Sequence, residues 1–599
     1  MLDEPARSLD AIRSDPARYE RRVLEKEGGH HRARAIVPNR EVLGFLLFDA
    51  AGAPVQLEAP PWVPRFESFE ALKSHADARS SDGRLLHVAL PTGRSVFALW
   101  APVEETVSWN LPATLRQRVE RTAGGYVMLF AEGSGRPLGH ALAGFGLTPL
   151  QQRVVAAVVR YGNLRSAASK IGLSYATIRE TMAGAARRMN LPNTPAVVGT
   201  AVAAAFGIMP YDLEAPALLA DMLGISERQA RVALLVSGGA SRAEAAKASG
   251  TTTAVIKKEL EALFASLGVK SAAELSRLIT EAQALRMFAR STDNAPGFLD
   301  PAIEPSRFAV RPNGRGVIAW SDYGPASGKP VLVVHSNWCC RFVPRVLAVE
   351  LQRRGWRPIA IDRPGFGGTS LGSANREDPF AQAVADTLQL LDAARIDTIP
   401  IIARCGAQFV LALKAAAADR TGPAVLVSPT PAADSRGKRA GPVGAFKEAF
   451  FRSPRLIEFF FGAISAQFTY GRVEHLMHVI SRGSPTDEAL CADPQFIRDR
   501  FRALRPFTTG NFRGGVLEEM VISHNIWPLP PLEVDDWLIL QGGEDPLNAT
   551  DEVEAYWKRV LPRTAVEVVP DAGRFMTSSH PSLVINRLEA LSKLAAPNK

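Results

Sequence analysis

Four cysteines, Cys339, Cys340, Cys405 and Cys491, are the residues best suited to covalent chemistry or metal binding. A thiolate is a strong nucleophile and also a good ligand for zinc. No two of the four form a C-x-x-C pair, and none stands at metal-ligand spacing from a histidine. We therefore expect no metal site and no cofactor, which leaves nucleophilic chemistry to consider. So few cysteines in 599 residues also indicate a reducing compartment.

The elements that would position a nucleophile lie in the second half of the chain. From about Phe308 onward, strand-like and helical segments alternate, which is typical of a mostly parallel sheet with helices on both faces. The predicted strands are Lys329–His335, Trp356–Asp362, Ile399–Ala403, Ala424–Ser428, Trp537–Gln541 and Ala565–Val569, with a helix at Asp378–Ala394. A helical insertion at about 436–530 suits a cap over a pocket. It is rich in phenylalanine, including Phe446, Phe450, Phe451 and Phe459–Phe461.

The element order and the segment RPGFGGTS at 363–370 resemble the α/β-hydrolase superfamily over roughly residues 310–595, and we assign residues 305–599 to this domain. In that family the nucleophile lies in a small-x-nucleophile-x-small turn, because small residues permit a strained turn. The segment ARCGA at 403–407 places Cys405 at that position. The resemblance implies that the backbone N–H groups of Gly406 and of Ser336 or Asn337 form the oxyanion hole.

The two remaining triad positions of this family differ in how well they match. The acid position is occupied by Asp545 in the segment GGED, as the family pattern requires. The base position, normally histidine, is Arg574, which keeps its proton and cannot accept one from a nucleophile. Arg574 could pair with Asp545 and favour a Cys405 thiolate by its charge. His580 is expected to be a capping or surface residue, and no spacing ties His524 to the site.

An internal repeat with helical periodicity fills residues 147–282. Gly172 and Gly250 are 78 residues apart, and the same offset aligns the rest of the two copies without a gap. Each copy is predicted to contain two helices, a glycine turn and a longer third helix. Ser174 and Thr252 are the predicted N-caps of the two third helices.

Both copies, at 147–200 and 224–282, resemble the LuxR-type helix-turn-helix, most clearly in GGASRAEAAKASG and TTTAVIKKELEALF of the second copy. The resemblance implies that the third helix enters the DNA major groove. The residues that it places against DNA are Tyr175, Thr177, Arg179, Thr253, Val255, Lys257 and Lys258. The family's histidine position is Thr181 in one copy and Glu259 in the other, and a glutamate there is expected to repel phosphate. The alternative for this region is a helical bundle used for dimerisation.

The N-terminal part contains a charged arm, residues 1–38, and a small α+β domain at 39–140. Strand-like segments, an Asp49-x-x-Gly52 turn and three later strands give an order that loosely resembles a PAS-type sensor. A dimerisation domain without ligand is an equal alternative. The fold class expected for the chain is therefore multidomain: a PAS-like α+β domain, an all-α tandem helix-turn-helix, and an α/β-hydrolase fold with a helical cap.

Composition agrees with a folded protein that has acidic partners. The formal net charge is +9, which favours nucleic acid, and no signal peptide or membrane-spanning segment is expected. We expect a cytoplasmic, homo-oligomeric DNA-binding transcription regulator whose hydrolase-like domain senses a small molecule. One alternative is a Cys-dependent hydrolase, esterase-like, with an accessory DNA-binding module. Another is a scaffold whose helices bind protein.

Overall fold

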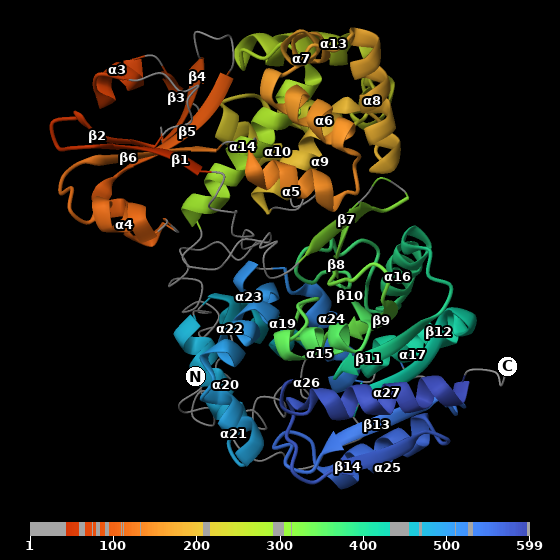
Figure 1. The fold of residues 1–599 in the computed structure, drawn as a ribbon. Helices are drawn as coiled ribbons and strands as arrows, with labels where there is room; N and C mark the ends of the chain where they lie inside the picture. Colours follow the sequence, from red (N-terminus) through yellow and green to blue (C-terminus); the bar gives the residue numbers. More distant parts are fainter. Residues whose placement is uncertain are drawn as a thin grey trace. The chain divides into compact units, whose positions relative to one another are not determined.

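The computed structural model divides the chain into two compact units, one made mainly of residues 35–301 and the other mainly of residues 318–599 (Figure 1). Each unit is described by itself. The expected N-terminal arm, residues 1–38, lies outside the described residues. The structure describes residues 43–58, 66–74, 76–78, 84–89, 95–109, 111, 113–131, 133, 135–207, 216–290, 305–312, 314, 316–431, 454–466, 470–509, 511–524, 527 and 531–595.

An antiparallel sheet of six strands begins the first unit, in the order β2-β1-β6-β5-β4-β3. The Asp49 carboxylate caps the first turn by accepting the N–H groups of Ala51 and Ala53, and Gly52 adopts a left-handed backbone there. The PAS-type assignment stays a prediction. The elements are β1 (Leu43–Phe48), β2 (Pro54–Glu58), α3 (Phe69–Ser74), β3 (Ala76–Ala78), β4 (Leu85–Ala89), β5 (Ser95–Pro102), η2 (Val103–Ser108), α4 (Ala113–Val119) and β6 (Tyr126–Ala131).

The helices that follow repeat with the offset found in the sequence. The first copy comprises α6 (Pro149–Tyr161), α7 (Leu164–Ile171), α8 (Tyr175–Arg188) and α9 (Thr194–Phe206). The second comprises α11 (Glu227–Ser237), α12 (Arg242–Ala248), α13 (Thr253–Ser266) and α14 (Ala272–Arg290). Corresponding helices begin 78 residues apart in all four cases. Two further helices, α5 (Arg136–Gly144) and α10 (Pro216–Leu223), each precede one copy.

Side-chain caps at equivalent positions explain why the helices of the two copies begin at the same offset. Ser174 accepts the N–H of Thr177, and Thr252 accepts the N–H of Val255, so both predicted N-caps are confirmed. The first helix of each copy begins with a reciprocal capping box, at Thr148 in α6 and at Ser226 in α11.

The helix α14 differs from its counterpart α9 in carrying buried charges. Arg277, which is 1% exposed, donates to the Ser95 carbonyl of β5 (2.9 Å) and forms an ion pair with Glu281. Glu281 also accepts the N–H of Gly133 after β6 (3.4 Å). At the positions of Arg277 and Glu281, α9 has only Gly199 and Ala203. The sheet and the helical repeats therefore share one buried polar network and belong to one compact unit, whereas the sequence predicted a boundary near residue 140.

An eight-stranded sheet has the order β14-β13-β12-β11-β9-β10-β8-β7, and its strands β8 to β14 form the basis of the second unit, while residues 307–317, with most of β7, are grouped with the first. From β10 to β14 all pairings are parallel, and β10 pairs with β8 antiparallel. The predicted strands and the helix α16 are confirmed to within a few residues at each end. The elements are β7 (Ser306–Val310), β8 (Val317–Asp322), β9 (Lys329–Val334), α15 (Arg345–Arg353), β10 (Trp356–Ile361), α16 (Ala381–Ala394), β11 (Ile399–Arg404), α17 (Ala407–Ala416), β12 (Thr421–Val427), β13 (Trp537–Gly542), α25 (Thr550–Val560), β14 (Ala565–Val569), α26 (Met576–Ser579) and α27 (Pro581–Ala595).

The cap region between β12 and β13 is helical where the structure describes it. Its apolar side chains, among them Ile457, Phe461 and Phe507, pack with Cys339, Cys340 and Phe342 of the sheet domain into one buried cluster. Phe446, Phe450 and Phe451, which the sequence places in the cap, lie outside the described residues. The cap helices are α19 (Pro454–Ala466), α20 (Tyr470–Ser481), α21 (Pro485–Cys491), α22 (Pro494–Ala503), α23 (Arg505–Thr509) and α24 (Arg513–His524).

Candidate functional site

A sharp turn between β11 and α17 presents Cys405. Its backbone has φ = 61°, a left-handed conformation that costs a non-glycine residue energy and often marks a functional turn. The turn is held by the N–H of Cys405, which donates to the Val427 carbonyl of β12 (3.0 Å). A Cβ atom on Gly406 would lie 2.5 Å from the His335 carbonyl oxygen, so glycine is required there. The ARCGA segment thus forms the strained strand-to-helix turn that the sequence predicted.

Asp545 and Arg574 meet at the loops that follow β13 and β14. Arg574 Nη1 lies 3.4 Å from Asp545 Oδ2, and the Asp545 carboxylate also accepts the N–H groups of Leu547 and Asn548. Burial lowers the pKa of the Arg574 guanidinium, but its electrostatic interactions with Cys405 and Asp545 outweigh the effect of burial, so the net shift is upward. The three predicted residues therefore lie within electrostatic range of one another. Arg574 stays protonated there and supplies charge but no base.

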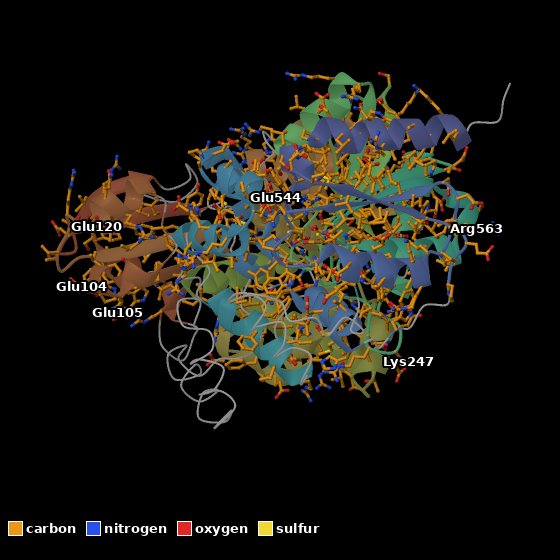
Figure 2. The ribbon with its side chains drawn as sticks, turned by 90° about the horizontal axis from the view of Figure 1, so that it is seen from below. Glu104, Glu105, Glu120, Lys247, Glu544 and Arg563 are labelled. Carbon is orange, nitrogen blue, oxygen red and sulfur yellow. The ribbon has the colours of Figure 1, made fainter. Side chains whose placement is uncertain are left out.

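A cap residue, Asp487 of α21, holds the Arg574 loop. Its carboxylate accepts the backbone N–H groups of Arg574 (2.7 Å) and Phe575 (3.2 Å). Burial raises the pKa of Asp487 to about 6, although these two hydrogen bonds act in the opposite direction. Nearby, Glu544 accepts hydrogen bonds from the Ser484 hydroxyl (3.0 Å) and the Thr486 N–H (3.1 Å); Glu544 is labelled in Figure 2. The cap is thus joined to both loops that carry the acid and base positions.

The predicted oxyanion residues follow β9. Asn337 donates its side-chain amide to Glu519 of α24, and the Trp338 indole donates to the same carboxylate (3.1 Å). Glu519 is fully buried. Among the described residues, neither the backbone N–H of Asn337 nor that of Gly406 donates to a protein acceptor. Both groups therefore remain able to donate to a bound oxygen atom.

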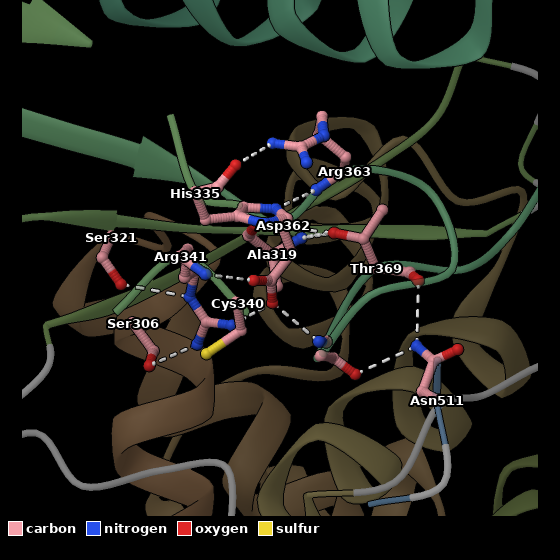
Figure 3. Close-up of polar contacts among 12 residues, drawn as sticks. Ser306, Ala319, Ser321, His335, Cys340, Arg341, Asp362, Arg363, Thr369 and Asn511 are labelled. Carbon is pink, nitrogen blue, oxygen red and sulfur yellow. Dashed lines mark hydrogen bonds and ion pairs between the residues drawn. The ribbon is translucent and has the colours of Figure 1, made fainter. Parts of the chain in front are cut away.

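His335 lies below the elbow but cannot replace the missing base. Its Nε2 accepts the Arg363 backbone N–H (3.2 Å; Figure 3), and its Nδ1 donates to the Ser336 carbonyl (2.7 Å). Burial holds the pKa of His335 well below its usual range, and the Arg363 charge lowers it further. Both ring nitrogens are occupied in a neutral, fixed tautomer. His580, the other candidate, contacts Ser579 and lies 3.8 Å from Asp571, and no contact joins it to Asp545 in the part of the chain that the structure describes.

Buried ion pairs fix the RPGFGGTS segment, and the sequence analysis did not identify them. Arg363 makes a bidentate pair with Glu518 of α24 (2.5 and 2.6 Å) and donates to the His335 carbonyl. Asp362 pairs with Arg341 and accepts the N–H of Gly368 (2.7 Å; Figure 3). The available signal was the acidic pair Glu518-Glu519 within a helix that is otherwise largely apolar.

The second candidate site consists of the third helices of the two copies. Tyr175 is 46% exposed, and Arg179, Thr253, Lys257 and Lys258 are also exposed. Thr177 and Val255 are half-buried next to their N-caps. The burial pattern along α8 and α13 agrees at most equivalent positions, so both helices present the same face outward.

The glutamate at the family's histidine position behaves differently from the expectation. Glu259 is buried and forms an ion pair with Arg228 of α11, so its charge is neutralised within the protein. The ion pair with Arg228 weakens the repulsion of phosphate that the sequence led us to expect from Glu259, and that repulsion stays a prediction. No sequence signal pointed to this pair, because Arg228 precedes Glu259 by 31 residues and only the packing of α11 on α13 brings the two together.

Comparisons with known proteins match the second unit. The model of the alpha/beta hydrolase family matches residues 331–587. Similar solved structures include an epoxide hydrolase from Vigna radiata (17% identity, 49% of this chain and 99% of that chain, TM-score 0.38). Others are a bromoperoxidase from Bacillus anthracis (15%, 48% and 99%, TM-score 0.35) and 2-hydroxy-6-oxo-6-phenylhexa-2,4-dienoate hydrolase from Rhodococcus sp. strain RHA1 (15%, 48% and 99%, TM-score 0.36). No curated protein sequence matches the chain. No helix among the described residues is long and apolar enough to cross a bilayer.

Proposed function

We propose, from the premise that residues 331–587 form an alpha/beta hydrolase domain, that this domain senses a small molecule and that the helical repeats bind DNA. The protein would then be a ligand-responsive transcription regulator. The ligand would be a small, partly apolar molecule held between the elbow and the cap.

The observation that carries the DNA proposal is the charge of the helical repeats. Residues 147–191 contain seven basic side chains, all exposed, and one acidic side chain, Glu180. A surface of this kind attracts the phosphate backbone. Equivalent exposed cations, Arg179 and Lys257, stand on both third helices. The preceding sheet region, in contrast, presents acidic residues, including Glu104, Glu105 and Glu120 (Figure 2). DNA binding would therefore be confined to the repeats.

Sensing is favoured over turnover by the groups around Cys405. Acyl transfer with turnover needs a group that accepts a proton and then returns it. Arg574 remains protonated, and His335 uses both ring nitrogens in structural hydrogen bonds. The Arg574 guanidinium and the backbone N–H groups of Asn337 and Gly406, which donate to no protein acceptor in the described part of the chain, can instead bind a carbonyl or carboxylate oxygen of a ligand.

The test of this proposal is DNA binding by the intact protein. Binding to mixed genomic duplex fragments should weaken steeply as salt rises, because counterions are released from the phosphates. If the protein shows no salt-dependent DNA binding, the proposal of a transcription regulator is refuted. The alternative of a scaffold whose helices bind protein is then favoured.

One observation favours a second candidate function, a Cys-dependent hydrolase. Cys405 has the strained backbone of a nucleophile and lies near a guanidinium that stabilises thiolate. Repeated turnover of an ester that is lost in Cys405→Ala would establish this alternative and exclude a domain that only senses.

A further inference from the structure

The two helical copies pack against each other chiefly through their fourth helices, α9 and α14, which lie side by side in the helical region (Figure 1). A Cβ atom on Gly199 of α9 would lie 3.6 Å from the Ser276 Cβ of α14. With the 78-residue offset, Gly199 corresponds to Arg277, the neighbour of Ser276. The helices therefore cross at matching points along their lengths, as two copies related by a two-fold axis would.

Reciprocal hydrogen bonds give the same result independently. Asn193, the N-cap of α9, donates its side-chain amide to the Gly239 carbonyl at the end of α11 (2.8 Å). Its equivalent Ser271, before α14, donates its hydroxyl to the Gly162 carbonyl at the end of α6 (2.6 Å). In each copy, a side chain at the start of the fourth helix thus donates a hydrogen bond to a carbonyl at the end of the other copy's first helix. An isologous interface has this property, because each side gives and receives equivalent contacts; here the donors are 78 residues apart and the acceptors, Gly162 and Gly239, are 77 apart.

We infer that one chain forms a pseudo-two-fold pair of DNA-binding modules, and that its partner is a duplex with two inverted, non-identical half-sites. This inference rests on the proposed DNA function. A two-fold relation between the copies turns the third helices α8 and α13 in opposite directions along a duplex. One chain then provides the two DNA-binding modules that a homodimer otherwise provides with two chains.

The half-sites differ because the exposed faces differ. The α8 face carries Tyr175 and Arg179, and its copy has seven basic residues to one acidic residue. The α13 face carries Lys257 and Lys258, and residues 225–269 contain six basic and four acidic residues. The first copy therefore contributes more of the phosphate attraction.

The experiment selects duplexes from a randomised double-stranded DNA library with the full chain. The mass of each complex is then measured by analytical ultracentrifugation. Selected duplexes should hold two inverted half-sites, centred about one helical turn, ~10 bp, apart. Each should bind one chain. Arg179→Ala should relax the sequence preference of one half-site, and Lys257→Ala that of the other, each with an affinity loss of roughly 10-fold. Lys558→Ala, an exposed lysine on α25 of the other unit, is the charge-matched control and should change neither.

The outcomes separate this inference from the proposed function. Two chains per duplex, half-sites in the same orientation, or a single substitution that relaxes both half-sites would overturn the pseudo-two-fold pair, while DNA binding itself would stand. Enrichment of no sequence, together with no salt-dependent binding, would instead refute the DNA function and this inference together.

Discussion

The elbow around Cys405 and the third helices α8 and α13 both have a well-defined backbone geometry, but they differ in whether their side chains suit the function proposed for them. The elbow has its left-handed residue and its obligatory glycine, yet a guanidinium occupies the base position. On the helices, capped starts and exposed cations occur together in both copies. The backbone geometry of the elbow is maintained by many contacts, whereas its chemistry depends on the identity of one side chain at the base position, so the two can be lost separately.

The largest expected effect concerns catalysis at the elbow. We expect Cys405 to be acylated once by an activated ester, with negligible steady-state hydrolysis, since each missing proton transfer typically accounts for roughly 10²–10⁴ in rate. Arg574→His should restore measurable turnover, because Asp545 already lies 3.4 Å from that side chain. Cys405→Ala is the control for background labelling. Multiple turnovers by the unmodified protein would show that the elbow has kept its catalytic groups, and would contradict the difference that we draw between the elbow and the third helices.

The buried network below the helical repeats gives the next prediction. Arg277→Met removes the cation that pairs with the buried carboxylates of Glu281 and Glu274, and should lower the free energy of unfolding by about 3–5 kcal/mol. The matched control is the double variant Arg277→Met with Glu281→Leu, which should recover much of the loss. Urea denaturation measures both. A single variant as stable as the parent would mean that the network does not join the sheet to α14.

The proposed DNA-binding face of α8 and α13 is expected to depend on two equivalent cations, Arg179 and Lys257. Replacing Arg179 and Lys257 together by alanine should lower affinity for a selected duplex by roughly 10²-fold or more, since each base contact is worth about 1–3 kcal/mol. Both side chains are exposed, so the circular dichroism spectrum should not change. Fluorescence anisotropy at fixed salt measures the affinity, and unchanged affinity would show that α8 and α13 are not the contact surface.

The smallest expected effect is a pH dependence from Asp487. Its folded pKa is about 6, against 3.8 as the ordinary value, so the folded state binds this proton more tightly than the unfolded state. The resulting stabilisation is full below about pH 3.8 and is lost as pH rises through 6, by up to roughly 3 kcal/mol.

The measurement compares wild type with Asp487→Asn by urea denaturation at pH 4 and pH 7. The wild type should lose stability relative to the variant on going to pH 7. Asp551→Asn, an exposed carboxylate on α25, is the control. If the difference in unfolding free energy between wild type and Asp487→Asn is the same at pH 4 and pH 7, the folded state does not raise the pKa of Asp487.

The sequence predicted the α/β sheet and the helical repeat well, because both depend on local periodicity and on caps such as Ser174 and Thr252. The ARCGA turn was predictable because small residues are needed where backbones approach closely. The pairing of Arg574 with Asp545 was also predicted, but the partners of His335 and Glu259 and the contact of Asp487 with the Arg574 loop were not. Each of these contacts involves residues distant in sequence or on another helix, and only tertiary packing sets those pairings.

The covalent link between the two copies has a consequence in terms of mass action. Contacts such as Asn193 with Gly239 and Ser271 with Gly162 join parts of one chain, so the pairing of the copies does not depend on protein concentration. A dimer of separate subunits dissociates on dilution, whereas the linked copies remain at a high effective concentration relative to each other. The pair of modules would thus stay assembled in a cell that holds only a few copies of the protein.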